Sequence, residues 1–191
     1  MEKGGMTEKL AALLLAHRGE YLSGEAISRS LGVTRAAVWK GMDRLRSEGW
    51  QVDSATNRGY RLAGAPDLLT APLVEAFLPG PREAPVLCYG ELDSTNLQGQ
   101  RLALEGAKSG TVVLADRQTS GAGRMGRDFY SPGGVGIYLS YLLAPRCGGE
   151  GLSLLTSCAR LAVCGAIRPP TGLQPAIKWP NDIILEGKKA C

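Results

Sequence analysis

The chain has 191 residues, a formal net charge of +4 and 21% charged residues, a globular composition that excludes a disordered tail. Its five cysteines are scattered and it has a single histidine, so we expect free, buried thiols and no protein-bound metal site. The charged N-terminus is unlike a signal peptide and no apolar run is long enough to span a membrane, so we expect a cytoplasmic protein without a membrane partner.

Residues 1–64 predict a winged helix-turn-helix. Three segments carry apolar residues at helical spacing, and each follows a residue that favours the N-cap position, namely Thr7, Ser23 and Thr34. The stretch 50–62, WQVDSATNRGYRL, has two strand-like runs around an Asn-Arg-Gly turn and predicts a hairpin. Three helices with a tight turn before the third, followed by a hairpin with a basic tip, are the layout of this DNA-binding fold.

A winged helix-turn-helix inserts its third helix into the major groove, with the N-terminal residues near base edges. The predicted DNA-binding residues are Thr34, Arg35, Ala36 and Lys40 on that helix and Arg58 in the wing, which would reach phosphates. A module that only packs against protein is the alternative. Residues 1–64 hold ten Lys and Arg against seven Asp and Glu, so DNA affinity would depend on a dimer.

The rest of the chain predicts a linker and a second domain. Residues 65–84 are rich in proline and show no long periodicity, which indicates a linker with one short helix at 68–78. Strands and helices alternate over 85–191, including a buried helix at 152–167, and polar residues gather at strand ends. The predicted fold class is therefore α+β, with a winged helix-turn-helix followed by an α/β domain.

The stretch 121–134, GAGRMGRDFYSPGG, begins with the G-x-G-x-x-G pattern of dinucleotide-binding loops. Such a loop needs a helix that begins inside it and an acidic residue about 20 positions later. The run Ser131-Pro132-Gly133-Gly134 forbids that helix, and Tyr141 stands where the acid should be. The sequence therefore argues against a dinucleotide site.

The same loop predicts an anion site instead. Glycine lets backbone N–H groups approach an anion, and Arg124 and Arg127 would neutralise it. A solvated surface turn is the alternative. Lys178 favours the ligand site, because a lysine beside Trp179 at a strand end is not a typical surface lysine and suits a phosphate or carboxylate oxygen.

Taken together, these segments resemble the bifunctional biotin protein ligases that double as biotin operon repressors. The resemblance rests on SGEAISRSLGVTRAAVWKGMDRL (23–45), NRGYRL (57–62), LDSTN (92–96), DRQTSGAGRMGRDFYSP (116–132), GIYLS (136–140) and KWPNDI (178–183). It implies a winged helix at 1–64, a linker at 65–84 and, at 85–191, the N-terminal part of a catalytic domain similar to that of class II synthetases.

The resemblance also implies a two-step reaction. Biotin attacks the α-phosphate of ATP, with Mg²⁺ assisting, and the resulting biotinyl-5′-AMP passes its biotinyl group to a lysine of a biotin carboxyl carrier domain. Lys178 and Arg124 would be catalytic. The biotin and adenylate site would comprise Ser94, Thr95, Asn96, Gln118, Gly121, Ala122, Gly123, Arg124, Arg127 and Lys178. The implied partners are the carrier domain of a biotin-dependent carboxylase, operator DNA and a second copy in a ligand-promoted homodimer.

Two features depart from the family pattern. Ala122 stands where the family usually has a basic residue, which bears on how long the adenylate is retained. The sequence stops at Cys191, whereas the family continues, so we expect a fragment or a naturally short chain with weak or absent ligase activity. A biotin-responsive DNA-binding regulator without ligase activity is the main alternative, and a lipoate ligase is a less favoured one.

Overall fold

The structure, a computed structural model, describes residues 5–78, 80, 82–145, 149–179 and 181–191. It divides into two units, Met1–Leu143 and Ala144–Cys191. Within the described residues, no helix has the length and apolar character needed to cross a membrane. The boundaries expected after residues 64 and 84 both fall inside the first unit, and they remain a prediction.

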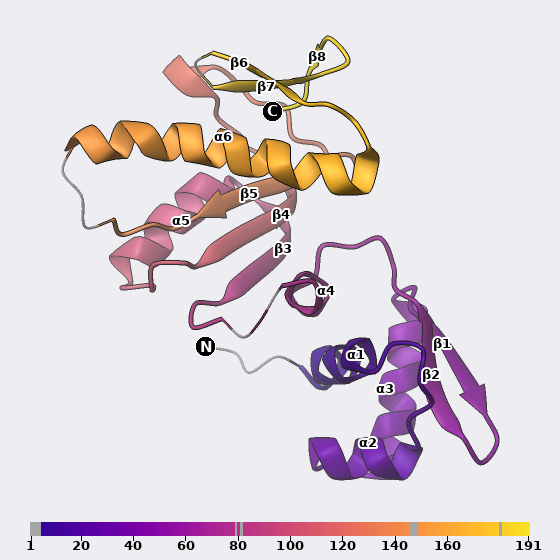
Figure 1. Ribbon diagram of the computed structural model, residues 1–191. Helices are drawn as coiled ribbons and strands as arrows, with labels where there is room; N and C mark the ends of the chain where they lie inside the picture. Colours follow the sequence, from indigo (N-terminus) through magenta and orange to yellow (C-terminus); the bar gives the residue numbers. More distant parts are fainter. Residues whose placement is uncertain (1–4, 79, 81, 146–148, 180) are drawn as a thin grey trace. The chain divides into compact units, whose positions relative to one another are not determined.

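The first unit begins with a winged helix. It comprises α1 (Met6–Ala16), α2 (Gly24–Leu31), α3 (Arg35–Ser47), β1 (Gln51–Ala55) and β2 (Gly59–Gly64) (Figure 1). Ser23 caps α2 by accepting a hydrogen bond from Ala26 N at 3.0 Å, as predicted. Thr34 caps α3 in the same way, through Ala37 N at 3.2 Å. The cap predicted at Thr7 is wrong, because Gly5 occupies the N-cap position and Thr7 falls inside the first turn of α1.

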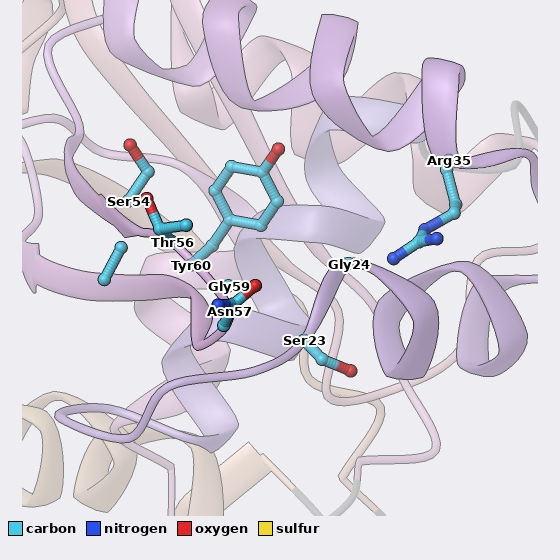
Figure 2. Close-up of a pocket in the computed structure, with 9 residues that line it drawn as sticks. Ser23, Gly24, Arg35, Ser54, Thr56, Asn57, Gly59 and Tyr60 are labelled. Carbon is cyan, nitrogen blue, oxygen red and sulfur yellow. The ribbon is translucent and has the colours of Figure 1, made fainter.

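The wing is fixed to the start of α2 by backbone pairing. Leu22 and Tyr60 exchange two hydrogen bonds, with N to O distances of 2.8 and 2.9 Å. Gly59, the residue before Tyr60, has φ +99°, and a Cβ added there would lie 2.1 Å from the Leu22 carbonyl oxygen. A cleft of about 470 Å³ lies between the wing and the first residues of α2 and α3, and Arg35 is among its lining residues (Figure 2).

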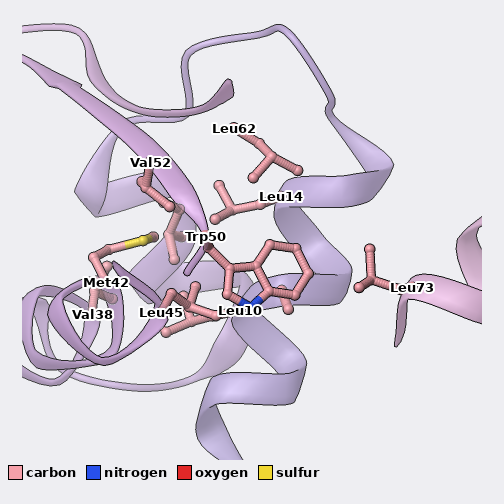
Figure 3. Close-up of a cluster of buried hydrophobic side chains, with 11 residues drawn as sticks. Leu10, Leu14, Val38, Met42, Leu45, Trp50, Val52, Leu62 and Leu73 are labelled. Atoms are coloured by element: carbon pink, nitrogen blue, oxygen red, sulfur yellow. The ribbon is translucent and has the colours of Figure 1, made fainter. Parts of the chain in front are cut away.

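A single apolar cluster holds the winged helix together. Each of its three helices contributes at least one fully buried side chain, and Trp50, which precedes β1, is only 5% exposed. The cluster consists of Leu10, Ala11, Leu14, Ile27, Val38, Met42, Leu45, Trp50, Val52, Leu62 and Leu73 (Figure 3). Burial of each large apolar side chain stabilises the fold by roughly 1.5–3 kcal/mol, so this cluster dominates the stability of the domain.

The second half of the first unit is a three-stranded sheet with one helix beside it. Its elements are α4 (Ala71–Ala76), β3 (Val86–Leu92), α5 (Thr95–Leu104), β4 (Val112–Gln118), the short 3₁₀ helix η1 (Arg124–Gly126) and β5 (Tyr138–Tyr141). The strand order is β3-β4-β5, with β3 and β4 parallel and β5 antiparallel to β4. The helix predicted at 68–78 is shorter, and it packs Leu73 into the winged-helix cluster.

The second unit comprises α6 (Gly149–Thr171) and an antiparallel sheet of β6 (Ala176–Lys178), β7 (Asp182–Leu185) and β8 (Lys188–Lys189). The helix predicted at 152–167 is present in α6, but the prediction that it is buried is wrong, because Leu154 and Leu161 are more than 60% exposed. α6 carries apolar residues on several sides, whereas the buried side chains in its described part, Arg160 and Cys164, lie four residues apart on one stripe.

The described cysteines are free thiols, as predicted, but the prediction that they are buried is wrong for Cys158 and Cys191, which are exposed, and Cys88 is only half-buried. They are Cys88, Cys158, Cys164 and Cys191, whereas Cys147 lies outside the described residues. Burial, with a smaller contribution from Glu75, raises the pKa of the Cys88 thiol to about 11. This thiol is therefore protonated and unreactive at neutral pH.

Candidate functional site

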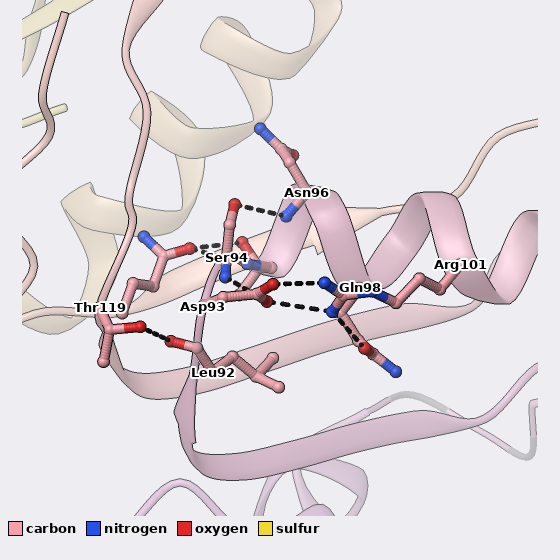
Figure 4. Close-up of polar contacts among 9 residues, drawn as sticks. Leu92, Asp93, Ser94, Asn96, Gln98, Arg101 and Thr119 are labelled. Carbon is pink, nitrogen blue, oxygen red and sulfur yellow. Dashed lines mark hydrogen bonds and ion pairs between the residues drawn. The ribbon is translucent and has the colours of Figure 1, made fainter.

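The start of α5 is a buried turn fixed by its own polar groups. Ser94 is 4% exposed, and its hydroxyl accepts a hydrogen bond from Asn96 N at 3.2 Å. The Asp93 carboxylate accepts from Ser94 N at 2.7 Å and forms an ion pair with Arg101 (Figure 4). The Arg101 guanidinium, followed by the Ser94 N–H, lowers the pKa of the Asp93 carboxyl. An ionised Asp93 therefore ties the turn to the body of α5.

Gln118, at the end of β4, joins this turn to Ser131, which lies in the 121–134 stretch after the glycines of the loop. Its Oε1 accepts hydrogen bonds from Thr95 N at 2.8 Å and from Thr95 Oγ1 at 3.1 Å. Its Nε2 donates to Ser131 Oγ at 3.0 Å. Because both ends of the side-chain amide have partners, the rotamer and orientation of Gln118 are fixed.

Two residues of this network were not predicted. Ser131 is 3% exposed and receives the Gln118 amide, and Ser140 of β5 lies 2.9 Å from Thr95 Oγ1 and 2.7 Å from Asn96 Oδ1. Ser140 could have been predicted from the sequence, because its hydroxyl interrupts the apolar run of the β5 segment. We name the set Thr95, Asn96, Gln118, Ser131 and Ser140 the polar network.

The glycine loop folds back on itself as a small hairpin. Ala122 forms a β-bridge with Asp128, Gly123 N donates to Arg127 O at 2.7 Å, and Phe129 N donates to Gly121 O at 2.9 Å. Its tip is η1, and no α-helix begins in the loop, as predicted. The side chain of Arg124 lies outside the described residues.

Gly121 connects this hairpin to the polar network. A Cβ added at Gly121 would lie 2.5 Å from the Phe129 carbonyl oxygen, 2.6 Å from Ser131 Oγ and 3.1 Å from Gln118 Nε2. Real Cβ atoms do not make such close contacts, so this position requires glycine. The structure thus brings the loop base together with Thr95, Asn96 and Gln118, whereas the roles predicted for these residues remain predictions.

Lys178 lies in the second unit, at the end of β6, where it is exposed and pairs in register with Asp182 of β7. The next residue, Trp179, stacks under the guanidinium of Arg160, which is 4.9 Å from the ring centroid. Arg160 is 7% exposed and donates to Ser157 Oγ at 2.6 Å. This buried cation over Trp179 was not predicted, and the sequence pattern of α6 gave no signal for it.

The residues predicted to contact DNA lie on α3 and the wing. Arg35, Ala36 and Lys40 are exposed. Thr34 is exposed too, but its hydroxyl already serves as the cap of α3.

Arg58 is held against the winged helix. Its guanidinium stacks on the ring of Tyr21 at 4.3 Å, and Arg61 approaches the same ring at 4.9 Å. In the absence of DNA, Arg58, the wing residue predicted to reach phosphates, is therefore stacked on the ring of Tyr21.

Comparisons with known proteins cover both parts of the chain. Residues 7–61 match an HTH domain. The bifunctional ligase/repressor BirA of Bacillus subtilis is 40% identical over 89% of this chain and 53% of its own length. The protein of the same name from Escherichia coli is 33% identical over 95% of this chain and 54% of its own. The chain thus spans about half the length of these curated relatives.

A solved structure of the biotin protein ligase from Aquifex aeolicus, in complex with biotin and ATP, has a TM-score of 0.48 at 38% identity. It covers 55% of this chain and 43% of that chain. Residues 89–190, more than half of the chain, match the biotin/lipoate A/B protein ligase family. The predicted family and the α+β fold class, with an N-terminal HTH domain before a ligase domain, are confirmed. The chain belongs to the biotin/lipoate A/B protein ligase family.

Proposed function

We propose that this chain acts as a biotin–protein ligase that also binds operator DNA as a repressor of the biotin operon. The observation that carries the proposal is the polar network, which lies in the ligase-family segment of a chain that also has a winged helix. Relatives named as bifunctional ligase/repressor support the same combination.

The polar network suits the ureido ring of biotin. That ring is neutral and presents one carbonyl acceptor and two N–H donors, so it needs a few fixed polar partners and no charge. The hydroxyls of Ser94, Thr95 and Ser140, which can both donate and accept, surround the start of α5. Gln118 fixes Thr95, so these groups would be oriented before biotin binds.

The activation step needs positive charge where phosphate charge develops. Lys178, Arg124 and Arg127 would supply it, and the backbone of Gly121, Ala122 and Gly123 would cover the adenylate. Mg²⁺ would enter with ATP, because this ion binds mainly to substrate phosphates and water and needs few protein carboxylates. The adenylate would then pass its biotinyl group to a lysine of a carboxylase carrier domain, in the cytoplasm. The adenylate would also promote a homodimer on the operator.

Biotin-dependent exchange of labelled pyrophosphate into ATP tests the ligase part of the proposal. The expected result is weak exchange that requires both biotin and Mg²⁺ and is not supported by lipoate. Exchange with lipoate but not with biotin would contradict the assignment.

Binding of biotin without exchange would favour the second candidate, a biotin-responsive regulator. The observation behind that candidate is Ala122, an exposed methyl side chain in the loop where the resemblance implies a basic group.

Replacing Gly121 with alanine is expected to weaken biotin binding about ten-fold or more, because the new Cβ would displace Ser131 or Gln118. Isothermal titration with biotin measures the change. Gly90→Ala is the matched control, because a Cβ added at Gly90 meets no atom within 4 Å. Equal biotin affinities for the two variants would show that the close approach at Gly121 does not shape the site.

A further inference from the structure

The exposed face of α3 carries a large apolar side chain. Trp39 is 55% exposed and lies about a quarter-turn around α3 from the face on which Val38, Met42 and Leu45 fill the core. A single exposed apolar residue is ordinary on a protein surface. This one, however, lies on the helix proposed to read DNA, one turn after Arg35 and on the same face.

The charges of α3 point to an anionic partner for the half that contains Trp39. In the C-terminal half, Arg44 is paired with Glu48 at 3.0 Å and Arg46 with Asp43 at 3.2 Å, so each of these cations has an acidic partner on the protein. Arg35 and Lys40 lie on either side of Trp39 in the sequence and form no ion pair within the described part of the chain. Cations without protein partners beside an exposed ring are the pattern expected of a surface that receives a polyanion.

We propose that Trp39 is a base-contacting residue whose indole packs against a thymine methyl group in the major groove. The thymine methyl is the apolar group that B-DNA presents there, so an indole inserted between two cations finds its complement in a thymine-containing step. Trp39 follows Arg35 by about 6 Å along the helix, which corresponds to roughly two base pairs. This inference rests on the proposed DNA-binding function and names a specificity determinant beyond the residues predicted from the sequence.

The test begins with the sequence preferred by the full chain. Duplexes that bind are selected from a pool with a randomised central region, and the selected site is then resynthesised with single thymines replaced by deoxyuridine, which lacks only the methyl group. Wild-type protein is expected to bind about four-fold more weakly when the contacted thymine is replaced, as for the loss of one buried methyl group. Trp39→Ala should bind the selected site about ten-fold more weakly and lose its sensitivity to deoxyuridine.

Controls separate base reading from general effects. Trp39→Phe keeps an aromatic ring and should retain most of the deoxyuridine effect. Leu104→Ala removes an apolar side chain that is 90% exposed on α5, and it should change nothing. Binding to a scrambled duplex should be within about two-fold of wild type for all three variants, because phosphate contacts carry non-specific affinity. Circular dichroism confirms that each variant is folded.

Three outcomes would overturn the proposal. In the first, Trp39→Ala weakens selected and scrambled duplexes equally. In the second, no single deoxyuridine affects the wild type. In the third, Trp39→Ala alters the oligomeric state by size-exclusion chromatography without affecting DNA affinity, which identifies a protein partner. Failure of the DNA-binding function itself is recognised separately, because wild-type protein would then select no sequence and Arg35→Ala would bind every duplex as the wild type does.

Discussion

Replacing Gly59 with alanine is expected to destabilise the winged helix by roughly 3 kcal/mol. Two effects add. An L-residue is strained at φ +99°, and the new Cβ would lie 2.1 Å from the Leu22 carbonyl oxygen and 2.7 Å from Ser23 Cα. Both of these contacts are backbone atoms, so no side-chain rotation relieves them. The wing would have to separate from α2 and break the pairing of Leu22 with Tyr60. Urea unfolding followed by tryptophan fluorescence, to which the buried Trp50 contributes, measures the loss.

Gly19→Ala provides the control for backbone strain. Gly19 has φ +87°, close to the value at Gly59, but a Cβ added there meets no atom within 4 Å. This variant should lose only about 1 kcal/mol, from the left-handed conformation alone. The difference between the two variants therefore isolates the close approach of the wing to α2. Equal losses would show that the wing is free of α2 in solution.

Replacing Lys178 with alanine is expected to slow biotin-dependent pyrophosphate exchange about 100-fold, equivalent to about 3 kcal/mol of transition-state stabilisation. The ammonium would act on charge that develops between the biotin carboxylate and the α-phosphate, so kcat should fall more than the KM for biotin rises. Steady-state exchange kinetics over a range of biotin concentrations separates the two effects.

Lys188→Ala is the matched control for Lys178. It removes another exposed lysine of the same three-stranded sheet, and Lys188 has no role in the proposed chemistry. Exchange by this variant should be within about two-fold of wild type, as for a surface charge that the reaction does not use. Retention of most of the exchange activity by Lys178→Ala would exclude the proposed role, and an equal loss in both variants would indicate a general charge effect.

Features fixed by neighbours in the sequence could be predicted. Ser23 and Thr34 cap their helices through N–H groups three residues away, and the wing turns at an Asn-Arg-Gly sequence that tolerates its backbone conformation. Ser94 also caps a helix locally, since its hydroxyl accepts from the N–H of Asn96, two residues away, at the start of α5. The resemblance grouped Thr95 with Gln118, and the structure joins them by two hydrogen bonds, although their part in biotin binding stays a prediction.

Burial and the identity of distant partners could not be predicted. Helix 152–167 has the composition of a buried helix, yet Leu154 and Leu161 are exposed, whereas Arg160 and Cys164 on another stripe of the same helix are buried. Tyr21 and Arg58 are far apart in the sequence, and no periodicity relates them. The error at Thr7 was local, since two neighbouring residues, Gly5 and Thr7, can both begin a helix.

By itself the sequence determined the α+β fold class, the winged helix and the lack of a helix start in the 121–134 stretch, because capping, periodicity and the effect of Pro132 and its neighbouring glycines act over a few residues. The resemblance of its motifs indicated the family. Tertiary structure alone decided that Ser131 and Ser140 complete the network around Thr95, and that Gly121 and Gly59 admit no side chain. The physical reason is the same for each of them. A hydrogen bond between residues 45 positions apart, or a backbone approach that excludes a Cβ, exists only once packing has brought the two segments together.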